Sequence, residues 1–201
     1  MRRAASPTRI ALSLATAGCL AVTLVPATAV PASAAYCDPA ASARSPGDGA
    51  DAARLAVACL INAERTQRGL QPLTSNPSLT TAAQQHTAAA VQLKWWGPGK
   101  DAHTNPQTGS TPQSRIKAAG YCPNPRSWAV AEIAYTGWGG AAASPKAAVT
   151  WWMHSPGHRR VILDGSLREY GSWAQAGAAD PAGTGANGSG TYVVTFGRCQ
   201  Q

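Results

Sequence analysis

The sequence predicts a single α+β domain in which helices come first and strands supply most of the end of the chain. Apolar residues recur at helical spacing between residues 51 and 69 and again between 76 and 96. Short apolar runs at 128–136, 168–176 and 191–197 are typical of strands. A turn dipeptide, Asn187-Gly188, lies in the long connection between the last two runs, so we expect them to form an antiparallel hairpin.

Residues 1–34 are predicted to be a secretory signal peptide. Arg2, Arg3 and Arg9 form a basic start, Ile10 to Val25 is apolar, and Ala32-Ser33-Ala34 fits a cleavage site. Lipidation at Cys19 is an alternative, although the apolar run continues past that residue. An uncleaved membrane anchor is a second alternative, although a run of about 16 apolar residues is short for a transmembrane span. We therefore expect a secreted, extracellular protein with no transmembrane span after cleavage.

The remainder of the chain is long enough for one domain. Cleavage would shorten the 201-residue chain to 167 residues, enough for a core. We place an N-terminal arm, disordered or tethered by a disulfide, at residues 35–50 and the domain at 51–201.

Three of the 17 basic residues and none of the 9 acidic ones lie in the leader, so the net charge falls from +8 to about +5. This mild charge does not favour nucleic-acid binding. It permits attraction to anionic walls or lipids, although a solvated basic surface is the simpler explanation.

Four cysteines remain after cleavage, and an even number in an exported chain predicts two disulfides. Three pairings are possible. We favour Cys37 with Cys59, which would tie the arm to the first helix, and Cys122 with Cys199, which would fix the last strand. Because no CxxC pair is present, a zinc-thiolate site or a redox dithiol is not expected.

The first long helix is expected to begin at Asp51 and to end near Gly69, with Pro72 beyond it. A second begins at Asn76-Pro77, a capping residue followed by proline, and runs to Trp95. His86 falls on the apolar face of this second helix. A histidine in that position is more often a hydrogen-bonded core residue than a ligand, and we expect the former.

Residues 101–109 are predicted to form a loop that contains His103, and a short helix follows from Thr111 to Gly120. Within the strand at 128–136, Glu132 is the one charged residue, and a carboxylate there must be paired or act as a ligand. A further helix starts at Ser144-Pro145. Pro156 lies between His154 and His158, so the chain is expected to break there into two helices, the second capped by Ser155.

Several short motifs occur in an order that resembles secreted bacterial proteins of the CAP superfamily, which comprises cysteine-rich secretory proteins, antigen 5 and pathogenesis-related 1. The resemblance covers about Ala52 to Gly197. The motifs are Asn62-Ala63-Glu64-Arg65, His103-Thr104-Asn105-Pro106, Arg115-Ile116-Lys117-Ala118-Ala119-Gly120-Tyr121, Glu132-Ile133-Ala134, Trp152-Met153-His154-Ser155-Pro156-Gly157-His158-Arg159, Glu169-Tyr170-Gly171 and Thr195-Phe196-Gly197.

This resemblance implies a three-layer α-β-α sandwich with a central antiparallel sheet and a large central cleft. It also implies a divalent-metal site, zinc being the candidate, built from His103, Glu132, His158 and Glu169. Two departures from the family pattern affect that site. The asparagine of the family's Gly-Glu-Asn-Ile-Ala motif is missing next to Glu132, and Ser155 stands where eukaryotic members have an acidic residue. The alternative is a metal-free cluster in which these histidines and glutamates bond one another.

We expect a monomeric, non-catalytic protein that binds an apolar, lipid or cell-envelope ligand in a cleft lined by some of its 7 tryptophans. The sequence contains no HExxH, GxSxG or Gly-rich phosphate motif. A first alternative is a metal-dependent peptidase or esterase that uses the histidine and glutamate cluster. Four protein ligands would leave no position for a zinc-bound water, which argues against that reaction. A second alternative is a protein-interaction module that acts through the loop at 180–190.

Overall fold

We describe the protein from a computed structural model, which covers Met1 and residues 37–201; the predicted signal peptide beyond Met1 lies outside the described residues. The α-helices are α1 (Pro39–Ala43), α2 (Ala50–Thr66), α3 (Pro77–Leu93), α4 (Pro112–Ala118), α5 (Pro145–His154) and α6 (Pro156–Ile162). The strands are β1 (Thr74–Ser75), β2 (Ser127–Gly137), β3 (Glu169–Ala176) and β4 (Gly190–Gln200). Short 3-10 turns occupy Pro46–Asp48, Gly140–Ala143 and Pro181–Gly183.

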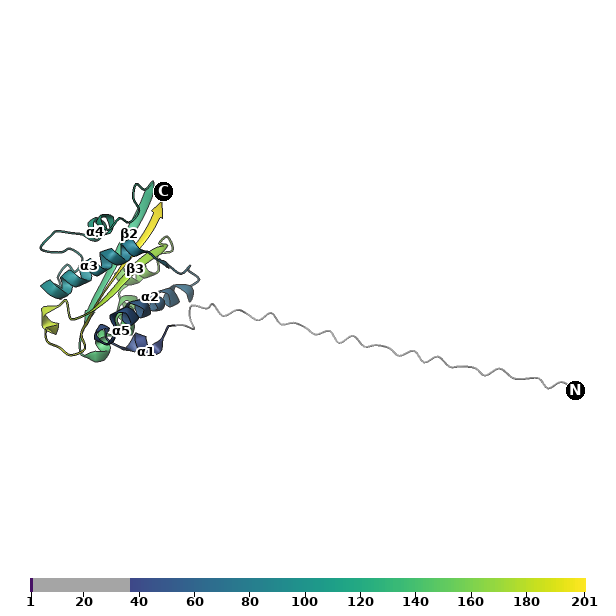
Figure 1. Cartoon of the computed structure of the whole chain (residues 1–201), viewed down its shortest axis with the longest axis horizontal. Coiled ribbons are helices and arrows are strands. Elements are labelled where there is room, and N and C mark those ends of the chain that lie inside the picture. The colour runs from purple at the N-terminus through teal and green to yellow at the C-terminus, as the bar shows by residue number, and fades with distance from the viewer. Residues whose placement is uncertain (2–36) are drawn as a thin grey trace.

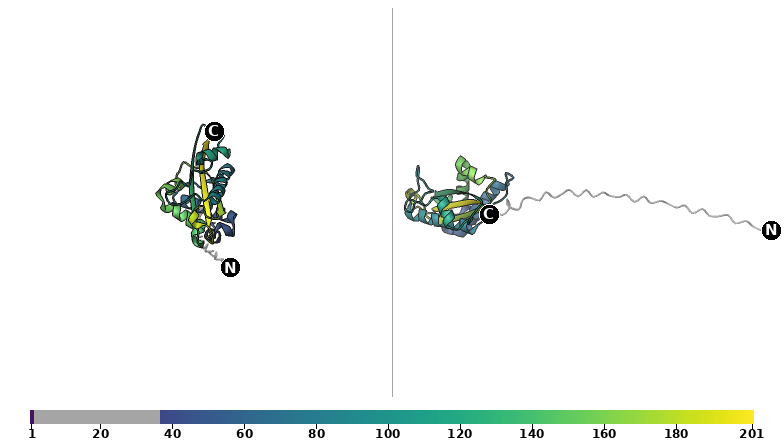
Figure 2. Two further views of the ribbon diagram at one scale, coloured as in Figure 1. Left: turned by 90° about the vertical axis from the view of Figure 1, so that its left-hand side faces the viewer. Right: turned by 90° about the horizontal axis from the view of Figure 1, so that it is seen from above.

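The strands form one sheet in the order β1-β3-β4-β2, so β2 is an edge strand. β4 pairs antiparallel with both β2 and β3, and only the two-residue β1 is parallel to its neighbour. Helix α3 packs on β3 and β4 from one side of the sheet, and α4 packs on β2, while α2, α5 and α6 supply the other layer (Figures 1 and 2). The predicted α+β sandwich with a largely antiparallel sheet is confirmed.

The largest core lies between the sheet and the layer of α2, α5 and α6. Trp152 is fully buried there and donates from its indole Nε1 to the carbonyl oxygen of Ala134 at 3.0 Å. On the opposite face, Gly171 of β3 lies against the start of α3, where a Cβ would overlap the backbone of Leu79 and Thr80. The alternation of strand residues therefore directs Ile133 toward the large core and Glu132 toward α3 and α4.

Most predicted boundaries are confirmed to within about three residues. Proline follows a capping residue at the start of α3, α4 and α5, as the sequence indicated. Both favoured disulfides, Cys37–Cys59 and Cys122–Cys199, are present. None of the helices within residues 37–201 has the length and apolar character needed to cross a membrane.

The segment before α2 is more ordered than the expected loose arm. Asp38 caps α1 by accepting a hydrogen bond from the Ala40 backbone N–H at 2.9 Å, and Pro39 provides the first helical residue. Ser42 and Pro46 are buried against the domain. These short capped turns were not predicted from the sequence because they are too brief to show an apolar period.

The connection between β3 and β4 also differs from the expected long loop. Asp180 is 9% exposed and caps the turn Pro181–Gly183 through the Ala182 backbone N–H. Ala178 and Ala179 are buried, and Gly183 lies against the ring of Trp138. The start of this connection and Gly183 therefore pack on the domain, while most of residues 181–189 are exposed.

Candidate functional site

Glu132 lies at the centre of a buried polar cluster on the edge strand β2. Its side chain is 0% exposed. One carboxylate oxygen, Oε1, is 2.9 Å from Nδ1 of His103, and the other, Oε2, accepts a hydrogen bond from Nη1 of Arg115 at 2.8 Å. Both oxygens are therefore engaged, which satisfies the requirement that a carboxylate in an apolar strand be paired.

Arg115 connects this strand to the loop that carries His103. Its Nη2 donates to the carbonyl oxygen of Ser110 at 3.0 Å and also to that of His103. Burial lowers the pKa of the guanidinium, while the charge of Glu132 opposes that effect. A buried arginine that holds two loop carbonyls and a carboxylate fixes the loop relative to the sheet.

His86 is the third basic residue near Glu132. Its Nε2 lies 2.8 Å from the carbonyl oxygen of Ala102 and 3.8 Å from Oε1 of Glu132. Because a carbonyl only accepts hydrogen bonds, Nε2 carries the proton. Burial is the main cause of its lowered pKa, and Glu132 opposes the shift. The expectation that His86 is a hydrogen-bonded core residue is confirmed.

A cavity of ≈ 430 Å³, large enough for a small ligand, borders the polar cluster. His86 and Arg115 form part of its wall. The remaining lining is mostly hydroxyl and amide side chains, among them Gln85, Asn105 and Ser114. The polar cluster therefore supports one side of a hollow between α3 and α4.

His158 comes from the opposite helical layer. Its Nδ1 lies 2.7 Å from the hydroxyl oxygen of Ser155, so this serine, predicted as the cap of α6, pairs with the histidine and makes no side-chain capping bond. Burial lowers the pKa of His158, and the neighbouring His103 lowers it further. The two predicted histidines are thus within electrostatic range of each other, although they bond different partners.

An aromatic surface adjoins His158. Trp151 is 50% exposed, and the centre of its ring lies 4.9 Å from that of His158 and 5.7 Å from that of Tyr135. Its neighbour Trp152 is fully buried, as expected for one of two adjacent tryptophans on a helix. We call the group of Tyr135, Trp151 and His158 the aromatic surface.

Glu169, the fourth predicted ligand, belongs to a separate group of hydrogen bonds. Its carboxylate accepts from the hydroxyl of Tyr121 at 2.6 Å and from the amide of Asn76 at 2.8 Å. Asn76 also caps α3. Burial, followed by the bond to Glu169, raises the pKa of Tyr121. Glu169 therefore joins the start of β3 to the start of α3 and to the segment after α4.

The four predicted zinc ligands are not gathered in one group. His103 and Glu132 are in contact, whereas His158 and Glu169 bond elsewhere. Within residues 37–201 no group of three or more His, Cys, Asp or Glu side chains is arranged to hold a metal ion. The donor set as it stands does not fit a tetrahedral zinc, because a guanidinium also occupies the Glu132 carboxylate. Zinc binding stays a prediction from the sequence.

Two members of the cluster, Arg115 and His86, were missed as site residues. Arg115 lies in one of the motifs that carry the family resemblance, but a charged residue on a short helix gave no sign of burial. The sequence did offer one indication of a buried partner, because the buried carboxylate of Glu132 requires one and an arginine is suitable.

Comparisons with known proteins agree with this architecture. The family model described as CAP, the cysteine-rich secretory protein family, matches residues 59–193. The chain resembles the structure of an outer surface protein from Borrelia burgdorferi with a TM-score of 0.54 and 19% identity, over 72% of this chain and 90% of that one. An extracellular protein from Bacillus anthracis that contains a SCP domain gives a TM-score of 0.55 at 16% identity, over 76% of this chain and 41% of that one.

A cysteine-rich secretory protein from Staphylococcus aureus gives a TM-score of 0.50 at 16% identity, over 77% of this chain and 40% of that one. The chain thus spans about two fifths of the last two proteins. No curated protein matches the sequence. At these identities the structural likeness concerns the fold alone.

Proposed function

The chain belongs to the cysteine-rich secretory protein family, and we propose that it works outside the cell as a non-catalytic protein that binds an apolar or lipid ligand of the cell envelope. The proposed binding site is the aromatic surface formed by Tyr135, Trp151 and His158. Two disulfides are consistent with an oxidising, extracellular setting. The similar proteins described as an outer surface protein and an extracellular protein support the same location.

The exposure of Trp151 carries this proposal. An indole that is 50% exposed leaves apolar area in water, and the neighbouring rings of Tyr135 and His158 extend that area. Covering such a surface with an apolar ligand is favourable. The side chain of His103 is 37% exposed and provides a polar group near the same edge of the sheet.

The polar cluster gives no comparable support to a hydrolase. A general base must lie within reach of a water, and the side chain of Glu132 is 0% exposed, with His103 and Arg115 bonded to its two carboxylate oxygens. The alternative of an interaction module at the loop 180–190 stays a prediction from the sequence, since Asp180 and Gly183 are buried while most of the loop is exposed. A ligand-binding role is therefore the one that the geometry favours.

We expect Trp151→Ala to weaken binding to phosphatidylglycerol vesicles or to palmitate about tenfold. The reason is that removal of a half-exposed indole loses roughly 1–2 kcal/mol of apolar contact. Vesicle co-sedimentation and calorimetric titration of the mature protein measure the change. Leu55→Ala is the matched control, because Leu55 is also exposed, at 57%, but lies on α2, outside the aromatic surface.

Wild-type protein and Leu55→Ala should bind equally. The proposal is wrong if Trp151→Ala binds as tightly as the wild-type protein, or if neither vesicles nor palmitate bind at all. Unfolding curves of both variants in urea serve to confirm that the fold is intact.

A further inference from the structure

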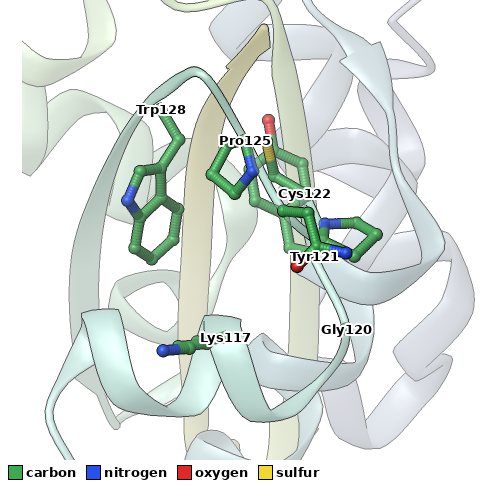
Figure 3. A pocket seen from close by; sticks show the side chains of 8 residues that line it. Lys117, Gly120, Tyr121, Cys122, Pro125 and Trp128 are labelled. Carbon is green, nitrogen blue, oxygen red and sulfur yellow. The ribbon is translucent and has the colours of Figure 1, made fainter. Parts of the chain in front are cut away.

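A second hollow, of ≈ 380 Å³, lies at the other end of β2 from the aromatic surface (Figure 3). Trp128 forms one side of it. Tyr121, Cys122 and Pro125 form the facing side, and Lys117 of α4 closes one end. This hollow contains none of the residues of the polar cluster or of the aromatic surface, so it is separate from the proposed function.

The two walls are held rigidly in place. Cys199 lies directly opposite Trp128 in the register of β2 and β4, and its disulfide to Cys122 fixes the facing wall. The hydroxyl of Tyr121 is bound to Glu169 at 2.6 Å, and its ring occupies the space left by the missing side chain of Gly197. A site whose walls need no rearrangement loses little free energy to ordering when it binds a ligand.

The backbone of the facing wall is in an unusual conformation. Cys122 and Asn124 both have φ of 54°, and they are two of the three non-glycine residues with positive φ in the described part of the chain. Left-handed backbone is unfavourable for a side chain such as cysteine and is enriched at binding sites. The result is a narrow turn that presents Asn124 at the rim of the hollow.

Three polar groups around this hollow have no hydrogen-bond partner within residues 37–201. They are the ammonium Nζ of Lys117, the indole Nε1 of Trp128 and the side-chain amide of Asn124. No acidic residue pairs with Lys117 among the described ion pairs. A flat indole face, an unpaired cation and nearby donors form a combination that suits a ring bearing a carboxylate and hydroxyl groups.

We propose that this hollow binds an acidic sugar, a hexose ring that carries a carboxylate. The C–H face of the ring lies on Trp128. The carboxylate pairs with Lys117, and ring hydroxyls meet the indole N–H and the Asn124 amide. Charge complementarity favours an acidic sugar over a neutral one, and the aromatic wall favours a ring over a simple anion.

The test is a two-dimensional NMR titration of the mature protein with glucuronate, glucose and acetate, following the indole N–H signals. We expect glucuronate to shift the Trp128 signal in a saturable way and to bind at least fivefold more tightly than either glucose or acetate. Trp128→Phe identifies that signal and keeps an aromatic ring against the buried residues of α3 and α4.

Lys117→Gln should weaken glucuronate binding about five- to tenfold and leave glucose binding unchanged. Lys146→Gln is the matched control, because Lys146 is an exposed lysine on α5 outside the hollow. The inference is overturned if glucuronate causes no saturable shift. It is equally overturned if glucose or acetate binds as well as glucuronate, or if Lys117→Gln and Lys146→Gln have the same effect.

Discussion

Replacing Glu132 with glutamine is expected to lower the free energy of unfolding by about 3–5 kcal/mol, because it leaves the buried guanidinium of Arg115 without its counter-charge. Arg115 is 5% exposed, so little water reaches it to replace the lost partner. Arg115→Met should lower the free energy of unfolding by a similar amount, because it leaves the buried carboxylate of Glu132 without its counter-charge. The loss of unfolding free energy in the double variant should be smaller than the sum of the two single losses by more than about 1 kcal/mol, since both members of the pair are removed together.

Urea unfolding followed by tryptophan fluorescence measures these changes. The matched control is the exposed pair of Glu64, in the last turn of α2, and Arg68, just after that helix, which are joined at 2.6 Å. Glu64→Gln should cost no more than about 0.5 kcal/mol, because exposed ion pairs contribute little. If the losses of unfolding free energy for Glu132→Gln and Arg115→Met are additive in the double variant, the two side chains are not coupled and the prediction is wrong.

The second large effect is expected at Arg65, which is 1% exposed at the end of α2. Its guanidinium donates to the carbonyl oxygens of Ile162 at 2.7 Å, Asp164 at 2.9 Å, Gln71 at 3.0 Å and Leu167 at 3.4 Å. Burial lowers its pKa, and the charge of Asp164 opposes the shift. This one side chain therefore fixes the end of α6, the helix that carries His158, and the segment after it.

Arg65→Met is expected to destabilise the protein by about 3–5 kcal/mol, since several buried carbonyl groups lose their donors. Arg65→Lys should recover only part of that loss, because an ammonium cannot reach carbonyls spread around a planar guanidinium. Thermal unfolding checks both variants, with Arg68→Met as the exposed control. A loss below about 0.5 kcal/mol for Arg65→Met would show that these bonds do not hold α6.

Local patterns in the sequence were enough to predict most of the fold. Asn76-Pro77, Thr111-Pro112 and Ser144-Pro145 mark helix starts because capping is a property of adjacent residues. The break at Pro156 was predictable for the same reason. Strand β1 was missed, since two residues carry no periodicity and pair only because Asn76 and Glu169 bring α3 and β3 together.

The site was harder to predict because its contacts join distant residues. The need of Glu132 for a partner was visible in the sequence, but the identity of that partner was not. Arg115 lies 17 residues away on a helix whose rotation about its axis depends on the packing of Ile116. Likewise, nothing local indicated that Glu169 bonds Tyr121, which lies 48 residues earlier in the chain.

We infer that Glu132 is a structural carboxylate, held by Arg115 and His103, and that this buried cluster forms without a metal. Calorimetric titration of zinc into the metal-stripped mature protein near pH 7.5 tests it most directly, alongside His103→Ala and His158→Ala. We expect no saturable one-to-one binding in the wild-type protein. Saturable one-to-one binding that both substitutions abolish would contradict the claim and establish the zinc site predicted from the sequence.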